Sequence, residues 1–247
     1  MKVVIIIPAR YGSTRFPGKV LVSLFDKPLI QWVYERAINS GIKDVFIATD
    51  STKVKEVAEA FGATVIMTSP EHPSGTDRIA EAVEVLGLPE DTLIINIQAD
   101  QPLLPYDYVP KLVQLFEEFK DIAIGTLATP IKDPSEVTNP NKVKVVLDHK
   151  GYALYFSRAP IPYGRDEFYH EFYLKHIGVY AYYKGFLKKF VNLPKGRLEE
   201  IEKLEQLRAM EAGYKIGVKV VDKNPPEVDT PEDLEYIIQN YEKEFKK

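Results

Sequence analysis

The sequence contains no cysteine among its 247 residues. That absence excludes disulfide bonds, a thiolate nucleophile and a cysteine-ligated zinc site. Long hydrophobic runs are also missing, because the apolar stretch VVIIIP follows only Met1 and Lys2 and ends at Pro8. This run is too short for a signal peptide or a membrane span. We therefore expect a cytoplasmic protein that does not bind membranes.

Neither sign of charge dominates the composition. The formal net charge of −4 gives no global attraction for nucleic acid or an anionic membrane, so any anion site must be local. The chain has 45% hydrophobic and 28% charged residues, which is typical of a globular protein. Its length suffices to bury the core of one large α/β domain, and we predict a single domain over residues 1–247.

The first half of the chain alternates short β-branched runs with segments of helical periodicity. Residues 3–8, 45–50 and 92–100 are predicted strands. Residues 28–41 and 76–87 are predicted helices, the first with Pro28 in its first turn. This order predicts a doubly wound α/β fold with a mainly parallel sheet and helices on both faces.

The pattern changes after about residue 130. The segments KVKVVLD (142–148) and YALYFSR (152–158) flank HKG and predict a β-hairpin, and HIGVYAYY (176–183) predicts a further strand. We therefore predict an antiparallel insertion over about residues 131–192. Residues 158–175, rich in proline, tyrosine and charge, are expected to form an exposed loop.

A basic loop follows the first predicted strand. Ligands of open α/β sheets bind outside the carboxyl ends of the strands, and Arg10, Arg15 and Lys19 leave the sheet there, with Gly12 and Gly18 between them. The loop is not a P-loop, because five residues separate the two glycines and a valine stands where the Ser or Thr should follow the lysine. Two guanidinium groups and an ammonium suit a triphosphate, although a solvated basic turn is the alternative.

Two aspartates are candidate metal ligands. Asp100 ends an apolar strand just before the turn at Pro102, and a carboxylate beside a phosphate loop commonly holds magnesium. Asp229 precedes Thr230 and Pro231, which account for a helix start as N-cap and first helical residue. Asp229 is thus either a second metal ligand or a charge favoured near a helix N-terminus.

Further polar positions carry weaker signals. The HPSGTDR segment (72–78) suits the binding of a base or sugar, although Ser74 and Arg78 are also ordinary helix-start residues. Strand alternation puts His176 and Tyr180 on one face, which either lines a sugar site or faces solvent. A single helix over 197–213 would place Glu205 near its apolar side, within reach of Arg208 three residues on.

Six segments of the chain, in order and spanning nearly its whole length, resemble one family. They are IPARYGSTRFPGK, SGTDR, VKVVLDHKGYALYFSRAPIPY, KHIGVYAY, LEQLRAMEAG and VDTPEDLE. Together they are similar to the 3-deoxy-manno-octulosonate (Kdo) cytidylyltransferases, or CMP-Kdo synthetases. One departure is QADQP, where the family usually has QGDEP, so that Gln101 replaces an acid.

The resemblance implies a fold, an activity and a set of site residues. The implied fold is the three-layer, Rossmann-like mixed sheet of nucleotide-diphospho-sugar transferases, with an antiparallel insertion that mediates a homodimer. The implied reaction transfers CMP from CTP to the anomeric hydroxyl of Kdo, with release of pyrophosphate, for lipopolysaccharide synthesis. Mg²⁺ would be held by Asp100 and Asp229, which with Arg15 and Lys19 form the catalytic set. The implied CTP-binding residues are Arg10, Ser13, Arg15, Lys19, Ser74, Gly75 and Arg78, and the implied sugar-binding residues are Gln98, Arg158, Arg165, His176, Tyr180, Glu205 and Gln206.

Other functions remain open on the sequence alone. A cytidylyltransferase for another acidic sugar, such as sialic acid, would share the opening loop. Another nucleotidyltransferase or a sugar-nucleotide glycosyltransferase would share the nucleotide and metal residues but not the sugar pocket. A catalytically silent nucleotide sensor is disfavoured, because it has no need of both Asp100 and Asp229.

Overall fold

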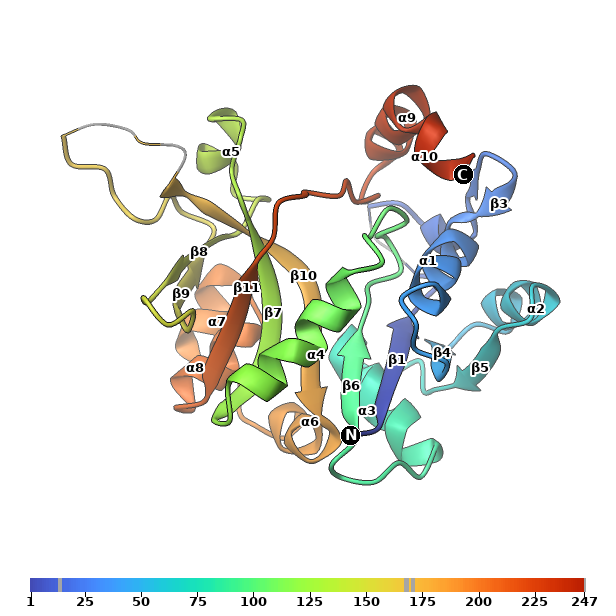
Figure 1. Cartoon of the computed structure of the whole chain (residues 1–247). Helices are drawn as coiled ribbons and strands as arrows, with labels where there is room; N and C mark the ends of the chain where they lie inside the picture. Colours follow the sequence, from blue (N-terminus) through green and yellow to red (C-terminus); the bar gives the residue numbers. More distant parts are fainter. Residues whose placement is uncertain (13–14, 167–168, 170–171, 247) are drawn as a thin grey trace. The chain divides into compact units, whose positions relative to one another are not determined.

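The computed structural model describes residues 1–12, 15–166, 169 and 172–246 (Figure 1). The chain is mixed α/β, as predicted, and forms two compact units. The first unit comprises Met1–Pro110 and Pro225–Lys247, and the second comprises Lys111–Asn224. Within the described part of the chain, no helix is both long enough and apolar enough to cross a membrane.

The first unit contains a parallel four-stranded sheet. Its strands are β1 (Val3–Pro8), β4 (Val45–Thr49), β5 (Thr64–Met67) and β6 (Leu93–Asn96), in the order β6-β1-β4-β5. The four residues from Val4 to Ile7 have no exposed surface, as expected for a strand covered on both faces. The three strands predicted in this half are confirmed, and their parallel order brings their carboxyl ends to one edge.

Helices and a small hairpin complete the first unit. The helices are α1 (Leu29–Ile38), α2 (Thr52–Ala60), α3 (Gly75–Val85), α9 (Pro231–Asn240) and α10 (Glu242–Phe245), with a 3₁₀ turn η1 (Lys19–Leu21) and strands β2 (Ser23–Leu24) and β3 (Lys27–Pro28). The helix α4 (Tyr108–Glu118) runs from the end of the first unit into the second. Pro28 does not lie in the first turn of α1 as predicted: it has an extended ψ of 148°, pairs with Ser23 in β2, and caps the helix.

The second unit is built on mixed strands. They are β7 (Ile122–Pro130), β8 (Lys144–Leu147), β9 (Ala153–Ser157), β10 (Leu174–Tyr183) and β11 (Lys215–Val220). β11 runs parallel to β7, whereas β10 is antiparallel to both β7 and β8, and β8 and β9 form the predicted hairpin. Its helices are α5 (Ser135–Thr138), α6 (Lys184–Val191), α7 (Arg197–Glu202) and α8 (Gln206–Glu211). The antiparallel strands predicted within residues 131–192 are therefore confirmed.

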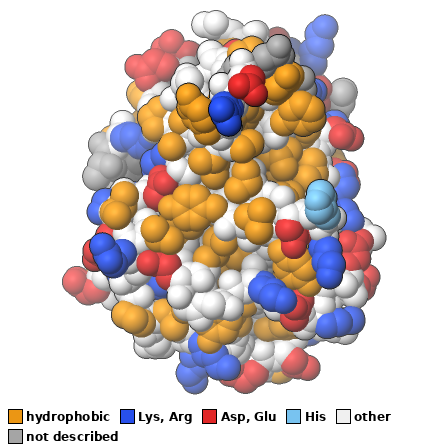
Figure 2. Space-filling model, turned by 90° about the vertical axis from the view of Figure 1, so that its left-hand side faces the viewer, with side chains coloured by type: hydrophobic (Ala, Val, Ile, Leu, Met, Phe, Trp, Pro, Cys, Tyr) orange, Lys and Arg blue, Asp and Glu red, His pale blue; other side chains and the backbone are white. Residues whose placement is uncertain are grey.

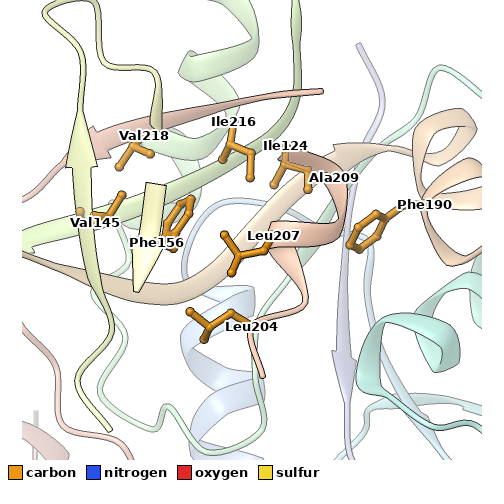
Figure 3. Close-up of a cluster of buried hydrophobic side chains, with 10 residues drawn as sticks. Ile124, Val145, Phe156, Phe190, Leu204, Leu207, Ala209, Ile216 and Val218 are labelled. Carbon is orange, nitrogen blue, oxygen red and sulfur yellow. The ribbon is translucent and has the colours of Figure 1, made fainter. Parts of the chain in front are cut away.

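One apolar cluster packs α6 and α8 against strands of this unit. Figure 3 shows Phe156 of β9 and Leu207 of α8 near Ile124 of β7 and Ile216 of β11. Phe156 and Leu207 have no exposed surface, and Phe190 of α6 is 3% exposed in the same cluster. This packing fixes α8 against the strands, and with it the position of Gln206 at the start of that helix.

The single helix predicted over 197–213 is wrong. The segment divides into α7 and α8, because Lys203 takes a left-handed φ of 54° and ends the first helix. Tertiary contacts hold this break: the Arg158 guanidinium donates to the carbonyl oxygens of Glu202 and Lys203 at 2.6 and 3.3 Å. Glu205 is therefore the residue that caps α8 rather than a mid-helix acid.

Candidate functional site

One cavity of about 260 Å³ lies in the first unit, at the carboxyl edge of its sheet. The residues that line it are Pro8, Arg10, Arg15, Lys19, Val20, His72, Pro73, Ser74, Gly75, Arg78, Gln98, Ala99, Asp100 and Asp229. Nine of them are residues that the sequence placed in the site. The structure therefore brings together every predicted site residue of this unit that it describes, and only Ser13 lies outside the described residues.

Lys19 joins the two predicted metal ligands. Its Nζ donates to Asp100 Oδ2 at 2.8 Å and to Asp229 Oδ1 at 3.1 Å, although these aspartates are far apart in sequence. A third bond goes to the Val228 carbonyl oxygen at 3.0 Å. The two carboxylates thus lie within reach of one cation, the Lys19 ammonium, and their role as a metal pair stays a prediction.

Local backbone structure positions each of these charges. Gly18 precedes Lys19 with a left-handed φ of 71°, and its N–H donates to the Tyr11 carbonyl oxygen at 3.0 Å, which closes the basic loop. The Val228 N–H donates to the Asp100 carbonyl oxygen at 2.9 Å. That bond fastens the segment before α9 to the turn after β6, so the two carboxylates are held side by side.

The helix α9 is capped without the Asp229 carboxylate, which lines the cavity instead. Thr230 caps this helix by accepting from the Asp233 N–H, while Asp233 Oδ2 accepts from the backbone N–H groups of Asp229 and Thr230. The Asp229 carboxylate takes no part in this capping box. It meets instead Lys19 and Arg15, whose Nη2 lies 3.2 Å from Asp229 Oδ1.

Burial and opposite charge act on the same groups in this cluster. Burial raises the pKa of Asp100, against the opposing effect of the Lys19 ammonium. Burial also acts to lower the pKa of Lys19, but Asp100 and Asp229 outweigh it and raise that pKa above its ordinary value. Lys19 therefore stays protonated, and its charge opposes the rise that burial causes in the pKa of Asp100.

The donor set of this cavity suits magnesium. Mg²⁺ takes oxygen ligands in octahedral geometry and is commonly held by one or two carboxylates, with phosphate oxygens and waters at the remaining positions. Asp100 and Asp229 supply such a carboxylate pair. Across the described ranges of the chain, no group of three or more His, Cys, Asp or Glu residues gathers as a metal site. A metal held here would thus depend on a ligand's own oxygens.

Arg78 lines the cavity but is held by the protein. It is 2% exposed, and its guanidinium donates to Asp50 Oδ2 at 2.7 Å and to Thr68 Oγ1 at 2.5 Å. Ser74 starts α3 as its N-cap by accepting from the Asp77 N–H at 3.2 Å. The SGTDR segment therefore has its predicted helix-start role, and its role toward a nucleotide stays a prediction.

The sequence did not single out His72, which lines the cavity, or Asp50, which holds the cavity residue Arg78. His72 lines the cavity and its Nε2 lies 2.5 Å from Glu81 Oε2. Burial raises the pKa of Glu81, but the Ser69 N–H, His72 and Arg78 outweigh it and keep that pKa below its ordinary value. Asp50 directly follows β4, so the rule for carboxyl ends of strands could have found it; His72 gave no comparable signal.

Gln98 and Gln101 have different surroundings. Gln98 lines the cavity, and its Nε2 donates to Asn96 Oδ1 at 3.0 Å. Gln101, which replaces an acid of the family pattern, is 1% exposed and donates through Nε2 to Glu227 Oε1 at 2.8 Å. Gln101 therefore ties the turn after β6 to the segment that carries Asp229, which an acid at this position could not do by donating.

The remaining predicted residues belong to the second unit, where Arg158 is held entirely by main-chain acceptors. Its side chain donates to the carbonyl oxygens of Glu202, Lys203 and Pro140. The nearby Lys144 is fully buried, and its Nζ lies 2.8 Å from the Arg158 carbonyl oxygen. These contacts give Arg158 a structural task in addition to the sugar contact predicted for it.

His176 is half-buried and packs against neighbouring side chains of its unit. Its Nε2 lies 3.0 Å from Thr126 Oγ1, and its ring packs edge-on against Phe156 at 5.1 Å. Burial disfavours the charged imidazolium and lowers the pKa of His176 to about 3. His176 is therefore neutral at physiological pH.

Four other predicted residues surround the start of α8 or lie on the loop before β10. Tyr180 Oη lies 3.5 Å from Gln206 Oε1, and the His176 and Tyr180 rings are 5.4 Å apart, so these three side chains form one group. Glu205 pairs with Arg208 at 3.7 Å, but Arg208 contacts Glu199 more closely, at 2.6 and 2.7 Å. Arg165 is almost fully exposed beside Asp166.

Comparison with known proteins agrees with this geometry. A family model described as cytidylyltransferase matches residues 4–216. This chain belongs to the cytidylyltransferase family. Cytidylyltransferases are nucleotidyltransferases, so the predicted enzyme class and the resemblance read from the six segments are both confirmed.

Several curated members of the family are similar to this chain over nearly their whole length. An 8-amino-3,8-dideoxy-manno-octulosonate cytidylyltransferase from Shewanella pealeana is 52% identical over 95% of this chain and 96% of its own. A 3-deoxy-manno-octulosonate cytidylyltransferase from Thermodesulfovibrio yellowstonii is also 52% identical, with the same coverage. The two names differ in the substituent at carbon 8 of the sugar.

A solved structure supports the fold. A CMP:2-keto-3-deoxy-manno-octonic acid synthetase complexed with CTP has a TM-score of 0.91 and 42% identity, and the match covers 99% of this chain and 100% of that one. A cytidylyltransferase from Leptospira borgpetersenii, 19% identical with a TM-score of 0.64, shares the fold alone.

Proposed function

We propose that this protein transfers the cytidylyl group of CTP to the anomeric hydroxyl of Kdo and releases pyrophosphate, as a step of lipopolysaccharide synthesis. The observation that carries the proposal is the gathering of Arg10, Arg15 and Lys19 around Asp100 and Asp229 in one cavity. This arrangement fits a triphosphate with its metal. The 52% identical relative named for the same reaction supports the sugar.

The nucleotide is bound by the cavity of the first unit. Arg10 and Arg15 pair with triphosphate oxygens as guanidinium forks, and Lys19 adds a compact charge. The start of α3, with Ser74 and Gly75, borders the same space. Arg78 is fixed by Asp50 and Thr68, so its orientation is set before the nucleotide arrives.

Asp100 and Asp229 would hold Mg²⁺, which when bound supplies charge neutralisation and lowers the pKa of the sugar hydroxyl. The hydroxyl oxygen forms its bond to the α-phosphorus while the bond to pyrophosphate breaks. The cationic side chains stabilise the charge that develops on the phosphate oxygens. Among the described residues lining the cavity, His72 is the only imidazole, and Glu81 holds it, so no side chain there is assigned as a dedicated base.

The sugar contacts are assigned to Gln98 in the first unit and to six residues of the second. Those six are Arg158, Arg165, His176, Tyr180, Glu205 and Gln206. Gln206 Nε2 is buried with no hydrogen-bond partner among the described residues, which fits a donor that awaits a ligand oxygen. Neutral His176 and Tyr180 offer hydrogen bonds for hydroxyl groups, and exposed Arg165 offers a fork for the sugar carboxylate.

Association as a homodimer is part of the proposal. Large apolar side chains are exposed on the second unit, among them Leu154 of β9 at 59% and Ile201 of α7 at 76%. Figure 2 shows hydrophobic side chains gathered over the face of the molecule that carries these elements. An apolar gathering of this kind commonly marks an interface between proteins.

The deciding experiment measures pyrophosphate release with CTP, Mg²⁺ and three sugars in parallel. These are Kdo, 8-amino-3,8-dideoxy-manno-octulosonate and sialic acid. The expected result is fastest turnover of Kdo, no turnover after chelation of the metal, and recovery on adding Mg²⁺. The 8-amino sugar is the second candidate, because several similar relatives carry its name, and a higher kcat/KM for that sugar would select it. Faster turnover of sialic acid would contradict both assignments.

A further inference from the structure

The ammonium of Lys19 is fully engaged by the protein itself. Its three acceptors are Asp100 Oδ2 at 2.8 Å, the Val228 carbonyl oxygen at 3.0 Å and Asp229 Oδ1 at 3.1 Å. A lysine ammonium has three donors, so these contacts match its whole capacity. Its side chain is only 13% exposed. A side chain expected to bind phosphate is therefore already bound, to the two carboxylates that are expected to bind a metal.

A metal and the ammonium cannot both use these carboxylate oxygens. Mg²⁺ binds oxygen ligands at about 2.1 Å, which places it in the space between the carboxylates where the ammonium lies. Two cations crowded into a part-buried site repel strongly. Metal binding to Asp100 and Asp229 thus requires that the Lys19 head first move away.

We infer that Lys19 is a placeholder cation that keeps a divalent metal off Asp100 and Asp229 until a nucleoside triphosphate draws its ammonium away. The inference rests on the proposed function, in which this cavity takes CTP with a metal. Triphosphate oxygens offer Lys19 new anionic partners and at the same time offer the metal further ligands. Metal and nucleotide therefore enter together rather than one by one.

Only the head of the lysine has to move. The loop behind it is held by the Gly18 N–H bond to the Tyr11 carbonyl oxygen, and the Val228 N–H bond to Asp100 keeps the carboxylates in place. Four flexible carbons separate the ammonium from this fixed backbone. Because the coupling is one of equilibrium affinities, metal must raise nucleotide affinity by the same factor as nucleotide raises metal affinity.

The test measures binding of Mn²⁺ alone to the protein without nucleotide, from the EPR signal of the free ion. Lys19→Met removes the ammonium but keeps the length of the side chain, and we expect it to bind Mn²⁺ at least tenfold more tightly than the unmodified protein. Lys19→Gln serves the same purpose if the methionine variant does not fold. Lys27→Met, which removes an ammonium that pairs with Glu35, should leave Mn²⁺ affinity unchanged.

Arg15→Met is the sharper control. It also removes one positive charge next to Asp229, but the arginine that it replaces does not bridge the two carboxylates. Its Mn²⁺ affinity should rise far less than that of Lys19→Met, and the double variant Lys19→Met/Asp229→Asn should lose the gain. Equal gains in the arginine and lysine variants, or no gain in a folded Lys19 variant, overturn the placeholder role. The unmodified protein is assayed with CTP and Kdo alongside: absence of turnover there counts against the proposed function, not against the Mn²⁺ result.

Discussion

Arg15 and Lys19 leave the same loop but are held differently. Lys19 is 13% exposed and bridges two carboxylates, whereas Arg15 is 60% exposed and pairs with Asp229 alone among the described residues. An exposed ion pair of this kind contributes little to folding. Arg15 is therefore the residue at which a role in ligand binding separates best from a role in stability.

Replacement of Arg15 by alanine should reduce kcat/KM for CTP by about 10²- to 10³-fold, because it removes one preorganised donor to the developing phosphate charge. The thermal midpoint should stay unchanged. Lys55→Ala, which removes an exposed cation of α2 that pairs with Glu59, should leave both quantities as they are. Unchanged kcat/KM in the Arg15 variant would make the loop a solvated basic turn.

The half-buried imidazole of His176 should make stability depend on pH. Its pKa is about 3 in the folded protein and about 6.5 when unfolded, so between these values only the unfolded chain takes up the proton. The free energy of unfolding should therefore be fully retained above about pH 6.5. It should fall as the pH is lowered, by up to about 1.4 kcal/mol per pH unit from this residue.

Urea denaturation at pH 7 and pH 5 checks this expectation. The difference between the two pH values should be smaller in His176→Gln than in the unmodified protein by about 2 kcal/mol. His149→Gln, a change in the turn between β8 and β9, should leave the difference unaltered. An identical pH dependence in the His176 variant would show that its imidazole is not held neutral by burial.

Residue types and strand ends were enough to find much of the site. Arg10, Asp100 and Gln98 stand at or just after carboxyl ends of strands, where the topology alone makes them neighbours. The bridge formed by Lys19 was not predictable, because it depends on the fold of a loop and on a segment more than two hundred residues later in the chain. The burial of His176 was missed for a related reason, since alternation along one strand does not reveal what packs on either face.

At the scale of elements, the start of α9 places a stabilising cap beside a carboxylate that is proposed to bind a metal. Thr230 and Asp233 satisfy the first turn of the helix, and Asp229 is left to face Lys19 and Arg15. These two roles can be tested separately, because loss of the cap should lower the free energy of unfolding, whereas loss of the carboxylate should lower turnover.

Thr230→Ala should lower the free energy of unfolding by about 1 kcal/mol and leave turnover nearly unchanged. Ser51→Ala, which removes the cap of α2 outside the cavity, is the matched control and should lose about as much stability. Asp229→Asn should do the reverse and lose turnover without melting early. An Asp229 variant that melts early but turns over normally would assign that carboxylate to folding.

Capping residues and periodicity predicted β1, β4, β6, α1, α3 and the start of α9 in the first unit, because those signals are local. The break between α7 and α8 is not local. It depends on Arg158 of the β9 end, which donates to the carbonyl oxygens at the end of α7. The helical periodicity of the sequence continues through Lys203, so it gave no sign of a contact made by a residue so far away in the chain.

At the scale of the whole molecule, the exposed apolar side chains of the second unit predict a two-fold dimer. Light scattering at micromolar concentration should give twice the monomer mass. The double variant Leu154→Glu/Ile201→Glu should give a monomer, whereas Val85→Glu, a similar change on α3 of the first unit, should not. A monomeric unmodified protein would contradict the prediction.

The first unit consists of two stretches of chain with the whole second unit between them. During synthesis Lys19 and Asp100 leave the ribosome long before Asp229, so a nascent chain displays its basic loop and one carboxylate without the other. Chains fold from the N-terminus as they emerge, at about 5–20 residues per second. The cavity therefore stays incomplete until the second unit has been made, and a chain whose translation stops before residue 229 lacks one of the two carboxylates that line it.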